Sequence, residues 1–421
     1  MSKTYSHMIL LSGEQTAPNL LAARYYAPEK VYILHTDFWK SKLMAERLAM
    51  RLESMFPETR EVAAFQPGKV TETVSELLDE LPDLVVNITG GTKPMSIGAL
   101  QAAQRAGKDV IYVRSQGGKT EIDTYTFSKD GHSRVLVTHQ VMDAISLEDY
   151  LVSYFGTSYQ VTGVRGKKGT LGRAFEEAIE QALQPPVVDE IHMGWKHESG
   201  AVDVDAVIRC NNQVGIMEIK TGSKARSAEG IKQLALAGGQ RFFGTYARRF
   251  LVVNQDWTRL SNLKALAEAL DITVLELPEY REPRPLRSEE IQTLKQAIYS
   301  RLSKPARYVQ WEVVRQKVIE QCARMQYFLS TYDERKFQEQ AGDWEAGDQM
   351  IDFLNKSIGE TRDRILEDLA AWEPPAETSS LTDIIQSAIE MIDNGPHCKN
   401  WGDKKACERV TNALRSYIKA E

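Results

Sequence analysis

The residues best suited to chemistry lie in one short stretch, Val202–Gly222, where ionisable side chains interrupt two apolar runs. Asp205 lies in the first run, and Glu218 and Lys220 lie in the second. Polar residues 211–213 separate the two runs, so the pattern predicts a β-hairpin. Burying a carboxylate in a strand costs several kcal/mol unless a partner compensates its charge. We therefore expect these acids to share a compensating cation.

The spacing of these side chains favours a divalent metal with a lysine beside it. Asp205 and Glu218 can meet across the two strands and bind a hard cation, Mg²⁺ or Mn²⁺, through oxygen. Glu218 and Lys220 share one face because strand side chains alternate with period two. The ammonium then lies where a nucleophilic water and the developing charge of a phosphate would be. The alternative is a surface hairpin with ordinary exposed acids.

This aspartate, followed on the next strand by Glu-x-Lys, resembles the PD-(D/E)XK nuclease superfamily. The resemblance implies an upstream helix that carries a third acid, and Leu171–Leu183 has the apolar spacing of a helix. Glu176 is the candidate acid on that helix. We expect Asp203 to point to the face opposite Asp205 and to be a weaker candidate, although the family often has an acid at this position.

The resemblance implies a metal-dependent endonuclease with Glu176, Asp205, Glu218 and Lys220 as its catalytic residues. On this hypothesis Asp205, Glu218 and the main-chain carbonyl of Ile219 bind the metal, and Glu176 helps directly or through water. The metal activates a water and polarises the phosphate. Lys220 orients that water or stabilises the pentavalent state.

Composition limits the class of protein. A chain of 421 residues with 42% hydrophobic and 26% charged residues is typical of a globular protein of two or three domains. No apolar run approaches the ~20 residues of a membrane span, and the N-terminus lacks the pattern of a signal peptide. Four scattered cysteines fit a reducing cytoplasm. With a net charge of −6, any nucleic acid must be bound by local basic patches.

The N-terminal part of the chain alternates strand-like and helical runs, which predicts a parallel sheet with helices on both faces. The expected strands are His7–Leu11, Val31–His35, Glu61–Phe65, Leu84–Ile88 and Val110–Arg114. The expected helices are Pro18–Tyr26, Ser41–Met55, Val70–Glu80 and Pro94–Ala106. Ligands of such sheets bind at the carboxyl ends of the strands, so the loops there are the candidate binding site.

Two of those loops have the composition of an anion site. Leu11–Thr16 follows the first strand, and Asn87–Ser96, reading NITGGTKPMS, follows the fourth. Gly90 and Gly91 allow a close backbone approach to a ligand. A helix that begins just after them offers free N–H groups beside Lys93, which suits a phosphate. The chain has neither a P-loop nor a G-x-G-x-x-G motif at these loops. The alternative is a tight strand-to-helix turn with no ligand.

The NITGGTKPMS loop in a Rossmann-like domain resembles the CARF domain of CRISPR ancillary effectors. Together with the acidic hairpin it is similar to the cyclic-oligoadenylate-activated CRISPR nucleases. That resemblance implies a homodimer whose two CARF domains form one symmetric pocket for a ring of adenylates, most often cyclic tetra-adenylate and otherwise cyclic hexa-adenylate. Ring binding activates cutting of DNA or RNA in type III CRISPR antiviral defence.

The resemblance also implies which residues bind the ring. The candidates follow four of the expected strands, and they are Ser12, Gly13, Gln15, Thr16, Asp37, Phe38, Gly90, Gly91, Thr92, Lys93, Ser115 and Gln116.

The region after the hairpin predicts contacts to phosphates rather than to bases. Basic residues cluster between Lys224 and Arg249, and phosphate contacts carry affinity without sequence information. Ile231–Phe243 is expected to be a helix with two glycines, Gly238 and Gly239, inside it. We therefore expect a DNA or RNA substrate that is cut with little sequence specificity. A non-catalytic regulator or scaffold that senses a cyclic nucleotide is the alternative.

The expected architecture is α/β with four parts. Residues 1–140 form a Rossmann-like CARF domain, and residues 141–168 form a linker with a connecting helix, Ser146–Phe155. Residues 169–280 form a restriction-endonuclease-like α/β/α nuclease domain. Residues 281–421 form an α-helical extension with expected helices at Ser288–Leu302, Val309–Leu329, Ala346–Ala371 and Leu381–Asp393. A zinc site at His397, Cys398 and Cys407 is a weak alternative there, because the spacing is not that of a zinc motif.

Overall fold

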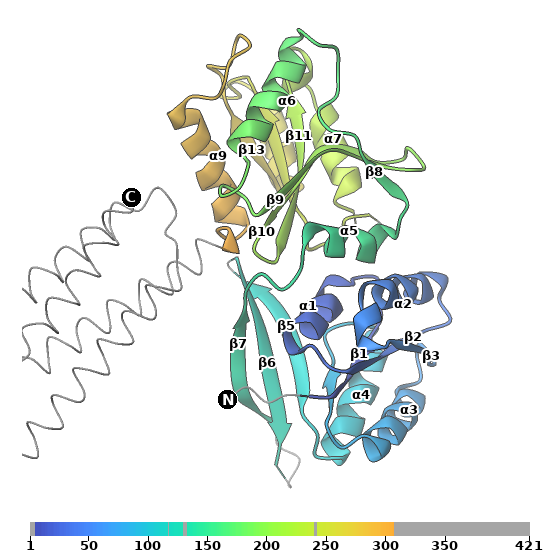
Figure 1. Ribbon diagram of the computed structural model, residues 1–421. Helices are drawn as coiled ribbons and strands as arrows, with labels where there is room; N and C mark the ends of the chain where they lie inside the picture. Colours follow the sequence, from blue (N-terminus) through green and yellow to red (C-terminus); the bar gives the residue numbers. More distant parts are fainter. Residues whose placement is uncertain (1–4, 117, 129–132, 240–241, 307–421) are drawn as a thin grey trace, which may run out of the picture. The chain divides into compact units, whose positions relative to one another are not determined.

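The computed structural model describes residues 5–306 except 117, 129–132 and 240–241 (Figure 1). By its contacts the chain divides into two compact units after Ala306. The expected helices beyond that residue and the zinc alternative at His397, Cys398 and Cys407 lie outside the described residues. Among the described helices, none has the length and apolar character that a membrane crossing requires.

The N-terminal domain is built on a seven-stranded sheet in the order β3-β2-β1-β4-β5-β6-β7. The strands from β3 to β5 are parallel to one another, whereas β6 and β7 form an antiparallel hairpin at one edge. The bounds are β1 His7–Leu11, β2 Lys30–His35, β3 Glu58–Glu61, β4 Leu84–Asn87, β5 Val110–Gln116, β6 Lys119–Phe127 and β7 Ser133–Val141.

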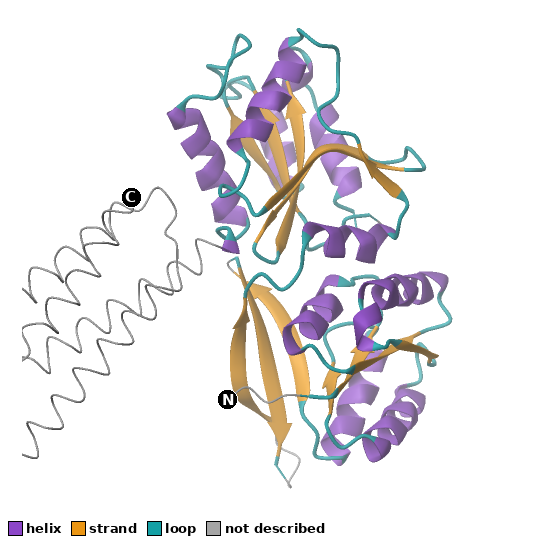
Figure 2. Ribbon diagram, in the orientation of Figure 1, coloured by secondary structure: helices purple, strands orange, loops and turns teal. Residues whose placement is uncertain are grey.

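Four helices cover the two faces of this sheet, as the alternation of the sequence predicts (Figure 2). Met8 and Leu10 of β1 belong to the hydrophobic cluster that includes α1 and α2, whereas Ile9 and Leu11 belong to the cluster that includes α3 and α4. This split follows from the two-residue period of a strand. The bounds are α1 Ala17–Tyr26, α2 Trp39–Arg51, α3 Pro67–Glu80 and α4 Lys93–Arg105, and a 3₁₀ turn follows α2 at Glu53–Met55.

The prediction for the third strand is wrong. Glu61–Phe65 was the apolar stretch, but β3 occupies the preceding polar residues 58–61 and pairs with β2 from Tyr32↔Glu58 to His35↔Glu61. An edge strand needs few buried side chains, so its sequence carries a weak strand signal. The next residues, including Ala64 and Phe65, instead line a cavity that is described below.

The second domain has a six-stranded sheet in the order β13-β12-β11-β10-β9-β8. Strands β8 to β11 are antiparallel, and β11, β12 and β13 are parallel. The expected hairpin is confirmed as β10 Asp203–Cys210 and β11 Gln213–Lys220. The other strands are β8 Tyr159–Val161, β9 Glu190–His197, β12 Arg248–Val253 and β13 Ile272–Glu276.

Helices cover both faces of the second sheet. The cluster on one face includes residues of α6 and α9, and the other face packs against α7 and α8. The bounds are α6 Leu171–Ala182, α7 Glu229–Ala237, α8 Ser261–Ala269 and α9 Ser288–Arg301, with a short 3₁₀ turn at Lys224–Arg226. Because Leu294 and Ile298 of α9 are fully buried against this sheet, the helix belongs to the same core as the hairpin.

The predicted helix Ile231–Phe243 is too long. Helix α7 ends at Ala237, and Gly238 is its C-cap residue, which is a common role of glycine. A side chain at Gly238 is also excluded, because its Cβ would lie 2.6 Å from Cδ of Arg249. The two glycines therefore end the helix, and residues 242–247 form a loop that leads into β12.

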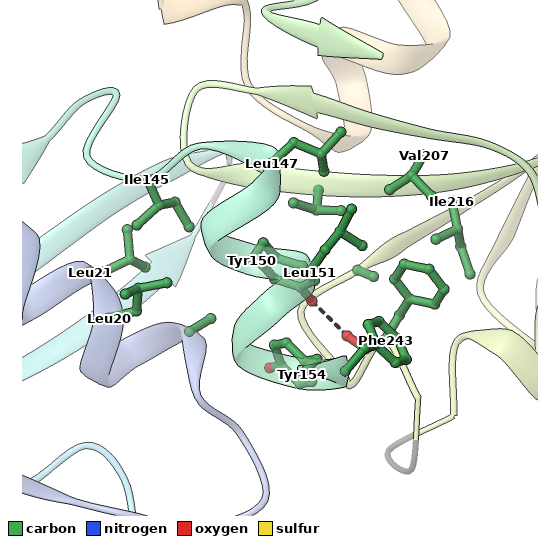
Figure 3. Packing of buried hydrophobic residues seen from close by; sticks show 14 of the residues in the cluster. Leu20, Leu21, Ile145, Leu147, Tyr150, Leu151, Tyr154, Val207, Ile216 and Phe243 are labelled. Atoms are coloured by element: carbon green, nitrogen blue, oxygen red, sulfur yellow. Dashed lines mark hydrogen bonds between the residues drawn. The ribbon is translucent and has the colours of Figure 1, made fainter. Parts of the chain in front are cut away.

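Helix α5, Leu147–Phe155, joins the two domains through a shared core (Figure 3). Its residues Tyr150, Leu151 and Tyr154 pack in one cluster with α1, with the β10–β11 hairpin and with Phe243. The buried hydroxyl of Tyr150 donates to the main-chain oxygen of Phe243 at 2.6 Å. The two sheets are therefore coupled by packing rather than by a loose linker.

Asp149 fixes the start of α5, and its replacement by asparagine should destabilise the protein by ~2 kcal/mol at pH 7. Burial raises the pKa of Asp149, but Arg51, the Ser146 main chain and Arg24 outweigh it and hold the pKa below its usual value. A lowered folded-state pKa means that the stabilisation exists above the unfolded pKa and is lost as the pH falls through the folded one. The stability difference between wild type and Asp149→Asn should therefore shrink below about pH 4.

Urea unfolding at pH 7 and at about pH 3.5 measures this difference. Glu148→Gln is the matched control, because Glu148 is the neighbouring acid but is exposed and lies 3.6 Å from the same Arg51. This control should lose less than about 0.5 kcal/mol. Equal losses in the two variants would contradict the assignment.

Candidate functional site

A cavity of about 560 Å³ opens at the carboxyl ends of β1, β2 and β4, where the parallel topology predicts a ligand. This volume is within the range of small-molecule sites. Segments that follow four strands, β1 to β4, and one residue of the second domain line it: Ser12, Gly13, Glu14, Gln15, Pro18, Thr36, Asp37, Phe38, Ser41, Ala64, Phe65, Thr89, Gly90, Gly91, Thr92 and Tyr246.

The glycines of the NITGGTKPMS loop are required by its packing against the first loop. A Cβ on Gly90 would lie 2.2 Å from the main-chain oxygen of Leu11, and Gly91 has φ +73°. The side chain of Asn19 donates to the same Leu11 oxygen at 2.8 Å and accepts from Asn87 at 3.1 Å. These contacts hold the two loops together, so that both present main-chain groups to the cavity.

The start of α4 supplies the expected anion-binding character. Thr92 is its N-cap residue, and its hydroxyl accepts from the main-chain nitrogen of Met95. Lys93 is the first helical residue and is exposed. The open N–H groups of a helix N-terminus and an ammonium beside them attract phosphate. At the cavity, the rings of Phe38 and Phe65 are 49% and 82% exposed, and such rings can stack on bases.

Eight of the twelve predicted ring-binding residues line this cavity: Ser12, Gly13, Gln15, Asp37, Phe38, Gly90, Gly91 and Thr92. Thr16 is buried beside it and shares a hydrogen bond with Ser153 at 2.8 Å. Lys93 is outside the lining, Ser115 lines a neighbouring cavity of about 270 Å³, and Gln116 ends β5. Contact with a ring stays a prediction for all twelve residues.

The acidic residues of the second domain converge from three elements. Asp205 of β10 and Glu218 of β11 both contact the Lys220 ammonium, which lies 3.0 Å from Asp205 Oδ2 and in direct contact with Glu218 Oε2. Asp205 Oδ2 also accepts from the Ile219 main chain at 2.7 Å. Glu176 of α6 is close enough for the charge of Asp205 to raise its pKa. Asp205, Glu218 and Lys220 are therefore in direct contact with Glu176 nearby, and their role in catalysis and metal binding stays a prediction.

Burial shapes the electrostatics of this cluster. Burial, followed by the charge of Asp205, raises the pKa of Glu176 to about 7. Glu218 is 1% exposed, and burial followed by Asp205 raises its pKa well above the usual value. Burial lowers the pKa of Lys220, but Glu218 and Asp205 outweigh it and the net pKa is raised. The arrangement is a cluster of acids that one ammonium neutralises in part, which is the charge pattern of a cation site.

The donor set fits a hard cation. Glu218 Oε1 is buried without a hydrogen-bond partner among the described residues, and carboxylate oxygens suit Mg²⁺ or Mn²⁺. Among the described residues, no group of three or more His, Cys, Asp or Glu side chains is spaced as a ready-made metal site. The Lys220 ammonium bridges Asp205 and Glu218 instead, so a cation bound by both acids must displace it from one of them.

Sequence reasoning missed Arg165 at this site. Its main-chain nitrogen donates to Glu176 Oε2 at 3.3 Å, and its guanidinium contacts Asp203 at 3.1 Å and the Gly194 carbonyl at 2.7 Å. The residue lies in a glycine-rich segment whose composition favours a solvated linker over a basic loop. The only sequence feature that could have indicated a role for Arg165 is the cluster of basic residues shortly before the helix that carries Glu176.

The expected orientation of Asp203 is wrong. Asp203 and Asp205 lie in the same strand, and a separation of two residues returns a side chain to the same face. Asp203 differs from Asp205 in its environment instead, since it is exposed and pairs with Arg165 at 3.1 Å. It lies at the rim of the acidic cluster.

Comparisons with known proteins agree with the fold of both domains. No curated protein matches the chain. A structure of Can2 from Sulfobacillus thermosulfidooxidans in complex with cyclic tetra-adenylate is 14% identical, has a TM-score of 0.51, and covers 70% of this chain and 97% of its own. A crystal structure of protein VC1899 from Vibrio cholerae is 12% identical, has a TM-score of 0.53, and covers 70% of this chain and 98% of its own.

The family comparison concerns the first domain. Residues 7–150 match the family model described as the Card1 CARF domain. The matched range begins at β1 and ends within α5, so it includes the whole seven-stranded sheet and the cavity loops of the first domain. The prediction drawn from the NITGGTKPMS loop is confirmed at this level, and residues 7–150 of this protein are a CARF domain.

Proposed function

We propose that this protein is a cyclic-oligoadenylate-activated nuclease of type III CRISPR antiviral defence. The CARF domain binds the ring, with cyclic tetra-adenylate preferred to cyclic hexa-adenylate. Binding activates metal-dependent phosphodiester hydrolysis of DNA or RNA in the second domain. The observation that carries the proposal is the convergence of Glu176, Asp205, Glu218 and Lys220 within the compact unit that also contains the CARF domain.

The ring site supports the proposal through its chemistry. A cyclic adenylate has phosphates, which suit the N-terminus of α4, and adenines, which suit the exposed rings of Phe38 and Phe65. A ring with an even number of identical adenylates can have two-fold symmetry, which suits two copies of one cavity. We therefore propose a homodimer in which each subunit contributes the same cavity residues. Can2, which shares the fold, has been solved with cyclic tetra-adenylate.

The second domain supports hydrolysis through its acidic cluster. Asp205, Glu218 and the Ile219 carbonyl would hold Mg²⁺ or Mn²⁺, with Glu176 directly or through water. The metal supplies a water of lowered pKa and a polarised phosphate. Glu176, whose raised pKa is near neutrality, accepts or holds a proton at its carboxyl. Lys220 places its positive charge beside the phosphate and stabilises the charge that develops there.

The contribution of Lys93 can be tested by ring binding alone. Lys93→Ala should weaken the binding of cyclic tetra-adenylate about tenfold, because it removes a charge-assisted contact to phosphate. The loss should be smaller at high salt, because salt screens exposed charges. Lys69→Ala is the matched control, since Lys69 is an exposed lysine of α3 that already pairs with Glu72 and does not stand at the start of α4. Equal affinities of both variants would contradict this role.

A cleavage assay tests the whole proposal. Single- and double-stranded DNA and RNA are incubated with Mn²⁺, with or without cyclic tetra- or hexa-adenylate. We expect cleavage of at least one substrate only when metal and ring are both present, with little sequence preference. Ring binding with no cleavage of any of the four substrates would favour the alternative, a non-catalytic sensor or scaffold.

A further inference from the structure

We propose that Tyr246, a residue of the second domain, belongs to the ring-binding pocket of the CARF domain and senses its occupancy. We define residues 242–247, which join α7 to β12, as the Tyr246 loop. This inference rests on the proposed function, because it names the residue through which the ring acts on the nuclease site. It assigns a ligand contact to the second domain, the proposed nuclease domain, rather than to the CARF domain.

The position of Tyr246 between two cavities is the first argument. It lines the 560 Å³ cavity together with CARF residues such as Gly13 and Gly91, and it also lines the neighbouring 270 Å³ cavity. CARF residues such as Ser115 and second-domain residues such as Arg248 line that smaller cavity together. Of the described residues, Tyr246 alone lines both of these cavities. Tyr246 therefore lies at the boundary between the two cavities.

Gln15 connects the pocket to the Tyr246 loop. It lines the ring cavity, and its Oε1 accepts from the Tyr154 hydroxyl at 3.0 Å, from the Thr245 main chain at 3.2 Å and from the Thr245 hydroxyl at 3.5 Å. Its Nε2 is buried without a hydrogen-bond partner among the described residues. An unsatisfied buried donor is costly, so an acceptor atom of the ring gains by pairing with it. Such a pair would reorient the amide that holds Thr245.

The Tyr246 loop is packed so tightly against Gln15 that a change in the orientation of the Gln15 side chain should move the loop. Gly244 has φ +76°, and a Cβ there would lie 2.5 Å from Gln15 Oε1 and 2.9 Å from Tyr154 Cε1. One residue earlier, Phe243 is buried with ring centroids 4.6 Å from Trp195 and 4.9 Å from Phe155. Its carbonyl is the acceptor of the Tyr150 hydroxyl (Figure 3). The loop is therefore anchored in the shared core and against Gln15.

The two elements that flank the loop both reach the acidic cluster. Strand β12 follows it and pairs in parallel with β11, so that Leu251 lies beside Glu218 and Val253 lies beside Lys220. Helix α7 precedes it, and a Cβ on Gly230 would lie 3.4 Å from Cγ of Lys220. A shift of the loop thus changes the packing of the two elements that position Lys220, the residue that must release one acid for a metal.

Ring binding by variants of Tyr246 tests the assignment. Tyr246→Ala should weaken the binding of cyclic tetra-adenylate about ten- to hundredfold, as expected when one stacked ring is lost. Tyr246→Phe keeps the ring and should stay within about threefold of wild type. Leu236→Ala is the matched control, because Leu236 is an exposed apolar residue of the same domain outside the cavity lining. Unchanged binding by Tyr246→Ala, whatever its cleavage rate, overturns the assignment.

A second measurement uses only the wild-type protein, so it does not depend on the folding of a variant. Hydrogen exchange is followed by mass spectrometry with and without cyclic tetra-adenylate. Peptides that contain residues 242–253 should exchange at least about fivefold more slowly with the ring. Binding without such protection overturns the inference and leaves the proposed function intact, whereas a wild-type protein that binds no cyclic oligoadenylate overturns both.

Discussion

Glu218→Gln and Lys220→Met should each lower the rate of ring-activated cleavage by at least about 10³-fold. Both substitutions keep the shape of the side chain and remove its charge. Glu218 has a buried carboxylate with one unpaired oxygen at the proposed metal site, and Lys220 supplies the ammonium that both acids contact. The CARF cavity uses neither residue, so the affinity for cyclic tetra-adenylate should stay within about twofold of wild type.

Cleavage and ring binding must be measured on the same preparations, because only their separation distinguishes a catalytic role from unfolding. Glu177→Gln is the matched control. Glu177 follows Glu176 on the same helix but is only partly buried and pairs with Arg173 at 2.8 Å. This control should cut at the wild-type rate. Metal-dependent cleavage that persists in Glu218→Gln and Lys220→Met would refute the assignment of the active site.

Arg209→Met should lower the free energy of unfolding by about 2–3 kcal/mol, because it removes the hydrogen bonds of a buried guanidinium to charged acceptors. The guanidinium of Arg209 lies 2.6 Å from Asp143 and 2.6 Å from Glu190, and it is 8% exposed. It also donates to the main-chain oxygen of Asn211 at 2.5 Å. Its removal leaves these acceptors facing one another in a partly dry environment.

The neighbouring contacts explain why this loss should extend to the acidic cluster. The hairpin turn is bonded to the segment after β7: Asn211 accepts from the Asp143 main chain at 2.6 Å, and Asn212 accepts from the Ala144 main chain at 2.7 Å. The other end of the same two strands carries Asp205 and Glu218. Through these hydrogen bonds, the turn connects the segment that follows the CARF sheet to the two strands that carry the acidic cluster.

Urea unfolding of the full chain measures this effect. Arg60→Met is the control, because Arg60 is a partly exposed arginine of β3 that pairs with Glu58 at 2.7 Å. It should lose less than about 1 kcal/mol. A loss of less than about 1 kcal/mol in Arg209→Met as well would mean that the junction is not a stabilising network.

The hairpin and the CARF sheet could be predicted because their signals are local. Asp205, Glu218 and Lys220 stand in apolar runs whose period of two fixes the face of each side chain. The loop at Gly90 and Gly91 follows a buried strand, where a parallel sheet places its ligand. Neither inference needed contacts between residues distant in the chain.

The missed features depend on such distant contacts. Strand β9 carries polar residues in alternation with Met193 and Trp195, and it is defined by its pairing with β8 and β10. Arg165 meets Glu176 and Asp203 only through the fold. Nothing local to Tyr246 in the sequence predicts that it lines a cavity of the CARF domain.

The most direct test of the account is a crystal structure of the protein with Mn²⁺, examined by anomalous scattering. Mn²⁺ scatters anomalously, whereas the Lys220 ammonium does not. We predict one anomalous peak at about 2.0–2.4 Å from oxygens of Asp205, Glu218 and the Ile219 carbonyl, with the Lys220 ammonium moved away from one of the two acids. Density that leaves the ammonium between Asp205 and Glu218 at saturating Mn²⁺, with no peak beside them, would contradict the metal-dependent mechanism.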